Sequence, residues 1–113
     1  MNKQLHNRVE EIAEEVIEIR RWIHQHAELS FHEKKTSNYI TQRLEEIGGG
    51  LIITHPTATS VMAVLKTDRK GPVIAIRADI DALPMDECSN LPFASQNKGA
   101  MHSCGHDGHA AIL

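Results

Sequence analysis

The sequence predicts an α/β fold made of two helices, three strands and the start of a further helix, in that order. Three observations predict it. Apolar residues recur at helical spacing in the first part of the chain and gather into short runs of branched residues afterwards. A glycine triplet at 48–50 marks the change. The run "VIAIRA" at 73–78 is apolar on both faces, as is typical of a strand buried between two layers.

The first helix is predicted over residues 8–27. Asn7 followed by Glu10 has the spacing of a capping box, in which side chains satisfy the free N–H groups of a helix start. Apolar residues then recur in steps of three and four, which places them on one face: Val9, Ile12, Val16, Ile19 and Ile23. The pattern predicts an amphipathic helix that buries this face.

The second helix is predicted to begin at Ser30 and to end at the glycine triplet. Ser30 and Glu33, in "SFHE", have the spacing of a second capping box. The residues that supply its inward face are Thr36, Tyr39, Ile40, Leu44 and Ile47. Glycine relieves the left-handed strain at a helix C-terminus, so the triplet predicts the end of this helix.

Three strands are predicted after the helices, at 51–54, 60–66 and 73–78. The first two, "LIIT" and "SVMAVLK", are short and rich in branched residues. Residues 85–100 contain proline, asparagine and glycine and are predicted to be a loop. The final "HDGHAAIL" has the pattern of a helix start.

Composition excludes several classes of protein. The chain has 113 residues, of which 41% are hydrophobic and 24% charged, and a formal net charge of −3. It has no basic cluster typical of nucleic-acid binding, no apolar run long enough to span a bilayer and no signal-peptide core at its N-terminus. These features predict a soluble cytoplasmic protein with neither a nucleic-acid nor a membrane partner.

The first cluster of candidate site residues is "ADIDALP" at 78–84, which contains Asp79 and Asp81. Ligands of open α/β sheets bind outside the carboxyl ends of the strands, and this acidic pair directly follows the predicted buried strand. We expect at most one of the two side chains to point into the crevice at the strand end, unless the backbone turns there. The alternative, two solvated loop acids, is slightly favoured by position alone.

The second cluster is "MHSCGHDGHAAIL" at 101–113, which holds three histidines, a cysteine and an aspartate within eight residues. Cys104 and His106 carry a thiolate and an imidazole, which are good ligands of zinc and other late first-row ions. Gly105 between them lets the backbone fold so that both can meet one ion. His109 would neighbour His106 in a helix, and Asp107 could ligate or hold an imidazole by its second nitrogen.

Three other interpretations of these residues are weaker. A surface histidine-rich loop explains five potential ligands poorly. A nucleophilic Cys104 would need a base, and a histidine two residues away is awkwardly placed for that role. A disulfide with Cys88 is disfavoured in a reducing cytosol. The remaining histidines are scattered along the chain, and most are expected to be partly exposed: His6, His24, His26, His32 and His55.

Several motifs, taken in order, resemble a known family. The motifs are "RRWIHQHAELSFHEKKTSNYI", "PTATSVMAVL", "IRADIDALPMDE", "LPFAS" and "MHSCGHDGHAAIL". Together they resemble the N-terminal part of the amidohydrolase branch of the dimetal aminoacylase/carboxypeptidase family, which includes hippurate hydrolases and N-acetyldiaminopimelate deacetylases. "CGHDGH" after "RADIDALP" is the most specific part. Ala27 departs from the family, which usually has proline there.

The resemblance implies a fold and a set of site residues. The fold is the N-terminal part of a layered, zinc-exopeptidase-like (phosphorylase/hydrolase-like) catalytic domain, so residues 1–113 are expected to be a truncated portion that lacks the lid or dimerisation domain. The implied metal ligands are Cys104 and His106, the implied catalytic acids are Asp79 and Asp81, and the residues implied to support the ligands are Asp107 and His109.

The resemblance also implies an activity. Members use two divalent ions, among zinc, manganese, cobalt and nickel, to activate water against the amide bond of N-acyl amino acids, and a homo-oligomer is expected for the full-length protein. The family's catalytic glutamate and remaining ligands lie downstream of these 113 residues, so we expect this chain alone to be inactive. The alternative is a non-catalytic short product that binds a metal or a partner.

Overall fold

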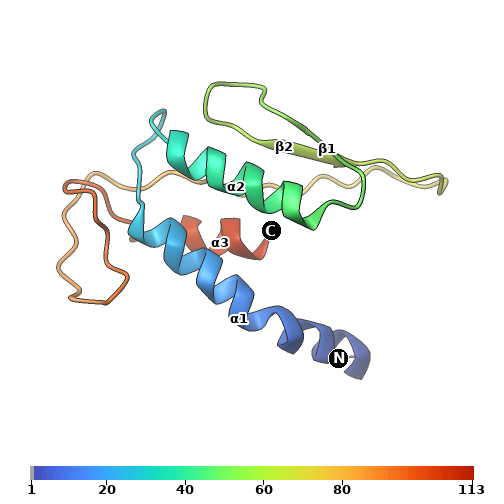
Figure 1. The fold of residues 1–113 in the computed structure, drawn as a ribbon, viewed down its shortest axis with the longest axis horizontal. Helices are drawn as coiled ribbons and strands as arrows, with labels where there is room; N and C mark the ends of the chain where they lie inside the picture. Colours follow the sequence, from blue (N-terminus) through green and yellow to red (C-terminus); the bar gives the residue numbers. More distant parts are fainter. Residues whose placement is uncertain (1) are drawn as a thin grey trace.

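The computed structural model describes residues 2–113 and contains three helices and one two-stranded sheet (Figure 1). The elements are α1 (Lys3–Gln25), α2 (Lys34–Ile47), β1 (Leu51–Thr54), β2 (Met62–Leu65) and α3 (His106–Ile112). This is the predicted order of helices, strands and final helix, with one strand fewer. No helix among these residues combines the length and apolar character that a membrane span requires.

Helix α1 begins earlier than the sequence predicted. The side chain of Asn2 accepts a hydrogen bond from the backbone N–H of Gln4 at 2.9 Å, so Asn2, not Asn7, caps the helix. The predicted capping box at Asn7 is wrong because a competent cap stands one turn before it and nothing between the two interrupts the helix. The apolar face is buried only at its C-terminal end: Ile23 is fully buried, whereas Val9 is 53% exposed.

Helix α2 begins at Lys34, not at Ser30, and its N-terminus is capped from a distance. The Glu28 carboxylate accepts hydrogen bonds from the backbone N–H of Thr36 at 2.8 Å and of Lys35 at 3.1 Å. This remote cap replaces the predicted Ser30–Glu33 box, since the carboxylate satisfies the same free N–H groups and favours the positive end of the helix dipole. The predicted end is confirmed: Gly48 has a positive φ of 65° at the C-cap.

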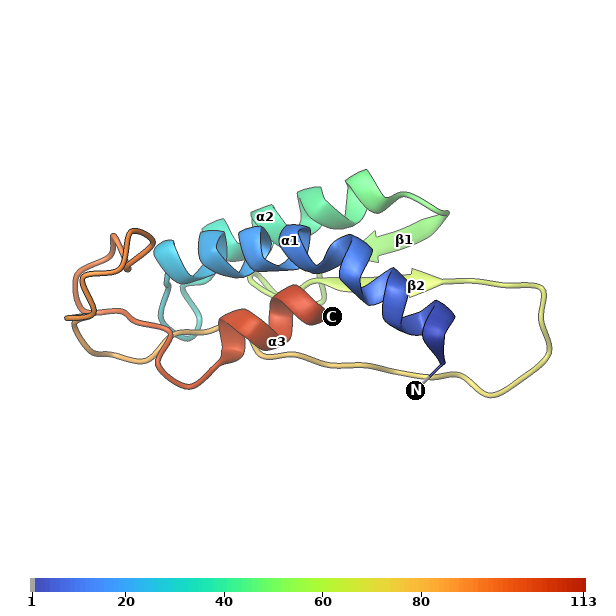
Figure 2. The ribbon, with the colours of Figure 1, turned by 90° about the horizontal axis from the view of Figure 1, so that it is seen from below.

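The sheet consists of β1 and β2, paired antiparallel with Leu51 opposite Leu65 and Thr54 opposite Met62. Among residues 2–113, the predicted third strand at 73–78 does not form, and its side chains are exposed instead of buried on both faces. A strand needs a neighbour for its backbone hydrogen bonds, and β1 and β2 pair with each other. Figure 2 shows this stretch running as an extended chain past the helices.

A small core joins the end of α1 to the two segments that carry the candidate site residues. Ala27, Ala82 and Ala100 are buried together, with Leu29 packed against them. An isolated parallel bridge joins Leu29 to Ala82, and an antiparallel one joins residues 83 and 101. These bridges bring the segment after residue 78 beside the segment before α3, which itself packs against α1 (Figure 2).

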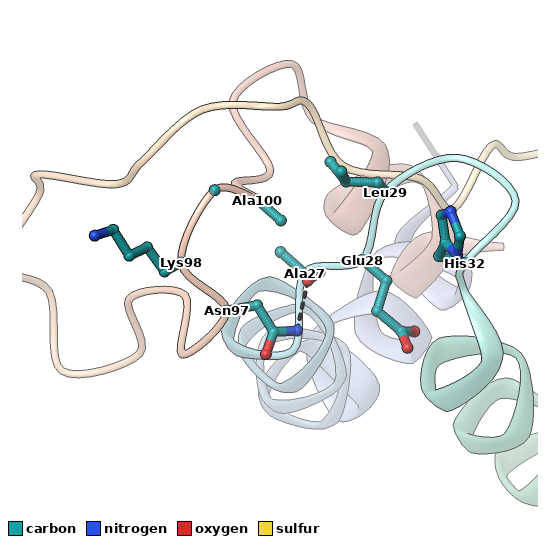
Figure 3. Close-up of a pocket in the computed structure, with 8 residues that line it drawn as sticks. Ala27, Glu28, Leu29, His32, Asn97, Lys98 and Ala100 are labelled. Carbon is teal, nitrogen blue, oxygen red and sulfur yellow. Dashed lines mark hydrogen bonds between the residues drawn. The ribbon is translucent and has the colours of Figure 1, made fainter.

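A shallow hollow of about 260 Å³ lies on one side of this core. It is lined by residues 27–29, His32 and residues 97–100 (Figure 3). The side-chain amide of Asn97 donates a hydrogen bond to the carbonyl of Ala27 at 2.7 Å. This contact between two lining residues holds the 85–100 loop to the end of α1.

Candidate metal centre

The two candidate clusters meet through Asp81 and His106. The Nδ1 atom of His106 lies 3.0 Å from the backbone carbonyl oxygen of Asp81 and 3.0 Å from its Oδ1. A carbonyl oxygen can only accept a hydrogen bond, so Nδ1 must carry a proton. In the neutral ring the lone pair then lies on Nε2. A histidine that donates from one nitrogen to a carboxylate or carbonyl and offers the other is the common arrangement of metal-ligating imidazoles.

Cys104 supplies the second candidate donor. Its thiol is free and exposed, two residues before His106. Gly105 between them has a φ of 106°, a backbone conformation that residues other than glycine rarely adopt, and it stands at the N-cap of α3. The chemistry of this donor set, a thiol and an imidazole nitrogen, fits a divalent late first-row ion. Within residues 2–113 no three such side chains are grouped to hold an ion.

Asp79 is not brought to His106. Its Oδ1 pairs with Arg77 at 2.6 Å, and both side chains are largely solvent-exposed. Asp81, by contrast, has a side chain only 28% exposed and directed at His106. The structure therefore separates the acidic pair, with one carboxylate at the imidazole and the other in a surface ion pair.

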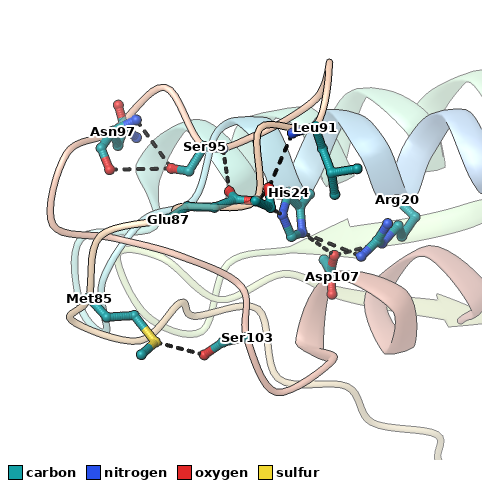
Figure 4. A network of polar contacts seen from close by, with 10 residues as sticks. Arg20, His24, Met85, Glu87, Leu91, Ser95, Asn97, Ser103 and Asp107 are labelled. Atoms are coloured by element: carbon teal, nitrogen blue, oxygen red, sulfur yellow. Dashed lines mark hydrogen bonds and ion pairs between the residues drawn. The ribbon is translucent and has the colours of Figure 1, made fainter.

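Asp107 points away from Cys104 and His106 and into the interface with α1. Its side chain is 1% exposed, and its Oδ2 lies 2.7 Å from Arg20 Nε and 2.8 Å from His24 Nδ1 (Figure 4). Burial raises the pKa of Asp107, but the hydrogen bond with His24 and the charge of Arg20 outweigh burial, so its pKa lies below the ordinary value. Asp107 therefore holds the imidazole of His24 on α1, which is not a predicted metal ligand.

His109 lies on the exposed side of α3. Its ring centroid is 6.4 Å from that of His106, as expected for residues three apart on a helix. The predicted helix start at "HDGHAAIL" is thus confirmed as α3, and it makes the two rings neighbours.

The residue that sequence reasoning missed is His24. Most of the five scattered histidines were expected to be partly exposed, and His24 is the exception, at 3% exposed. Besides Asp107, it contacts Glu87 in the loop, with Nε2 to Oε1 at 3.2 Å (Figure 4). Glu87 and Asp107 lie 63 and 83 residues away in the chain, so no local pattern reveals these partners. The spacing of Arg20 and His24, one helical turn, was the available signal.

Glu87 is the second buried carboxylate. Its side chain is 2% exposed, and its Oε2 accepts a hydrogen bond from the backbone N–H of Ser95 at 2.6 Å. Burial raises the pKa of Glu87, but hydrogen bonds from Ser89, Ser95 and His24 outweigh burial and leave the pKa below its ordinary value. Glu87 is therefore ionised at neutral pH and ties the loop together.

His102 is buried beside this group. It is 5% exposed, and neither of its ring nitrogens has a hydrogen-bond partner in the part of the chain that the structure describes. Its ring centroid is 6.3 Å from that of His24. Burial lowers the pKa of His102, so the ring is neutral at pH 7.

Comparison with known proteins gives consistent matches. The pattern of peptidase family M20/M25/M40 matches residues 75–113, which include both candidate clusters. An N-acyl-L-amino acid amidohydrolase of Geobacillus stearothermophilus is 50% identical over 93% of this chain, and a hippurate hydrolase of Campylobacter jejuni is 43% identical over 84%. The chain covers 28% and 24% of these two proteins, so it spans about a quarter of their length.

A solved structure matches the fold as well. The YXEP protein of Bacillus subtilis, described as a dinuclear metal-binding peptidase from the M20 family, superimposes with a TM-score of 0.81 at 48% identity. The match covers 90% of this chain and 29% of that protein. It confirms the predicted fold class, the N-terminal part of an α/β domain.

Proposed function

Because the chain belongs to peptidase family M20/M25/M40, we propose that it supplies one side of a two-metal centre in an amidohydrolase that cleaves N-acyl amino acids. Residues 1–113 then form the N-terminal portion of the catalytic domain. The observation that carries the proposal is the pair of contacts at His106 Nδ1, which leave the lone pair of Nε2 available to a metal ion, two residues after the exposed thiol of Cys104.

In this proposal Cys104 and His106 bind one face of the metal centre. Two divalent ions, chosen among zinc, manganese, cobalt and nickel, would supply Lewis acidity toward water and the amide carbonyl. Asp81 holds the His106 ring in the tautomer that can ligate and raises its basicity. Asp79 is the second proposed catalytic acid, and reaching the reacting groups requires its exposed pair with Arg77 to open. His109 and Asp107 support the ligands.

The test is hydrolysis of a panel of N-acetyl and N-benzoyl amino acids by the full-length protein of which residues 1–113 are the proposed N-terminal portion, because this portion alone is expected to be inactive. We expect turnover to be lost after treatment with a chelator and restored by one of the four ions. His106→Ala should abolish turnover, whereas His6→Ala, an exposed histidine on α1, should leave it unchanged. Turnover that survives chelation, or that His106→Ala leaves intact, would overturn the proposal.

One observation favours a second candidate, a protein that binds a metal without hydrolysis. In the described residues no three histidine, cysteine, aspartate or glutamate side chains are grouped to hold an ion, whereas a catalytic zinc site has three protein ligands. Tight binding of Zn²⁺ or Co²⁺ that depends on Cys104 and His106, with no turnover of any substrate in the panel, would support this candidate over the hydrolase.

A further inference from the structure

We propose that His24 is a positioning residue, which fixes helix α3 and the 85–100 loop against α1 and so holds His106 at Asp81. The part of this proposal that concerns metal affinity rests on the proposed function, and the part that concerns the His106–Asp81 contact does not. The proposal is carried by geometry, charge balance and the shortness of α3.

His24 lies on α1 and contacts both ends of the segment that leads from Asp81 to helix α3. Its Nε2 contacts Glu87, near the start of this segment, at 3.2 Å, and its Nδ1 contacts Asp107, at the end, at 2.8 Å. Figure 4 shows the ring between the two carboxylates. One side chain of α1 thus ties down both ends of the stretch that leads from the acidic pair to the metal-ligand pair.

Charge balance explains how the core tolerates this group. Each ring nitrogen of His24 lies within hydrogen-bond distance of a carboxylate oxygen, and the Arg20 guanidinium lies 3.5 Å from Nδ1. Arg20 also binds Asp107 at 2.7 Å and supplies a positive charge beside the two buried carboxylates. Losing one partner leaves an uncompensated buried charge, which makes the arrangement specific for this position of α3.

The shortness of α3 explains why these anchors decide its orientation. The helix has seven residues, and a helix this short has little stability of its own. Consecutive residues point about 100° apart around a helix axis, so His106 and Asp107 leave α3 in different directions. Asp107 is held by α1 and His106 by Asp81. Together these contacts fix the rotation of α3, and releasing Asp107 frees His106 to turn from Asp81.

The test compares the wild-type protein with His24→Asn, and uses His6→Asn as the control because His6 is an exposed histidine of the same helix. Ring ¹⁵N–¹H correlation spectra without metal report the protonation of each histidine nitrogen. We expect the wild-type protein to show His106 protonated at Nδ1. In His24→Asn we expect His106 to lose its preference for that tautomer.

Binding of Co²⁺, followed by its absorption bands, gives the second readout. Residues that orient metal ligands typically contribute 10- to 100-fold to affinity, so we expect His24→Asn to weaken Co²⁺ binding by about tenfold and His6→Asn to leave it unchanged. If the wild-type protein shows no Cys104-dependent Co²⁺ binding, the metal centre is refuted, while the His106 tautomer still decides the positioning role.

Glu87→Gln provides a milder variant if His24→Asn does not fold. It removes one of the two carboxylates from His24 and retains an acceptor for the N–H of Ser95. We expect the tautomer preference of His106 to shift in the same direction as in His24→Asn, by less. An unchanged His106 tautomer in every folded variant that alters His24 would overturn the proposal.

Discussion

The charged group around His24 and the extended stretch at 73–78 differ sharply in how their side chains are accommodated. Around His24, buried charged groups from three segments satisfy one another, and the side chains of Asp107 and Glu87 are almost fully enclosed. Around 73–78, apolar side chains face solvent, with Val73 97% exposed and Ile74 80% exposed. The buried polar groups around His24 have defined partners, whereas the apolar side chains of 73–78 remain exposed. We therefore expect the two regions to respond very differently to the same kind of substitution.

The largest effect is expected from removing a buried carboxylate. Asp107→Ala leaves Arg20 and His24 without their shared partner, and breaking a buried ion pair costs about 3–5 kcal/mol in the free energy of unfolding. The matched control is Asp79→Ala, which removes an exposed pair and should cost about 1 kcal/mol or less. Urea denaturation of both variants measures the difference. Equal losses in the free energy of unfolding would show that burial does not increase the contribution of the Asp107 contacts to stability.

The next effect compares two isoleucines. Ile23 is fully buried at the end of α1, and Ile23→Ala should lower the free energy of unfolding by about 2–5 kcal/mol, because it removes buried methyl groups and leaves a cavity. Ile76, in the extended stretch, is 74% exposed, and Ile76→Ala should change stability by about 0.5 kcal/mol or less. Thermal unfolding of the two variants tests this. A large loss at Ile76 would show that the stretch is packed in solution.

A pH dependence follows from Glu87. Its pKa in the folded chain lies below its ordinary value of 4.5, so the unfolded chain takes up the proton at a higher pH than the folded chain. The stabilisation is therefore fully present well above pH 4.5 and is lost as the pH falls through the folded pKa. Glu87→Gln should make stability fall less steeply with acid below about pH 5, whereas Glu11→Gln, at an exposed carboxylate, should not. The expectation would be contradicted if the free energy of unfolding fell equally steeply with pH in Glu87→Gln and in the wild-type protein.

The sequence predicts the features that depend on near neighbours. The helical periodicities, the end of α2 at Gly48 and the start of α3 after Gly105 are local, and the structure confirms them. Residue chemistry also singled out the two clusters that meet at His106. The strand at 73–78 was predicted from its apolar character, yet a strand also needs partners for its backbone. The burial of His24 depends on groups 63 and 83 residues away, which spacing cannot reveal.

The smallest effect concerns Glu28, the remote cap of α2. Its carboxylate accepts three hydrogen bonds from the first turn of α2: from the hydroxyl and N–H of Thr36 and the N–H of Lys35. Glu28→Ala frees these donors and should destabilise the protein by about 1 kcal/mol, the typical contribution of a helix cap.

Amide hydrogen exchange should localise the Glu28→Ala effect. We expect faster exchange in the first turn of α2, while exchange in α3 stays unchanged because Asp107 still anchors it to α1. A matched exposed change, Glu45→Ala, should leave exchange at the α2 N-terminus as it was. Equal acceleration of exchange in α2 and α3 would contradict this expectation. It would show that the charged group around His24 depends on the N-terminus of α2.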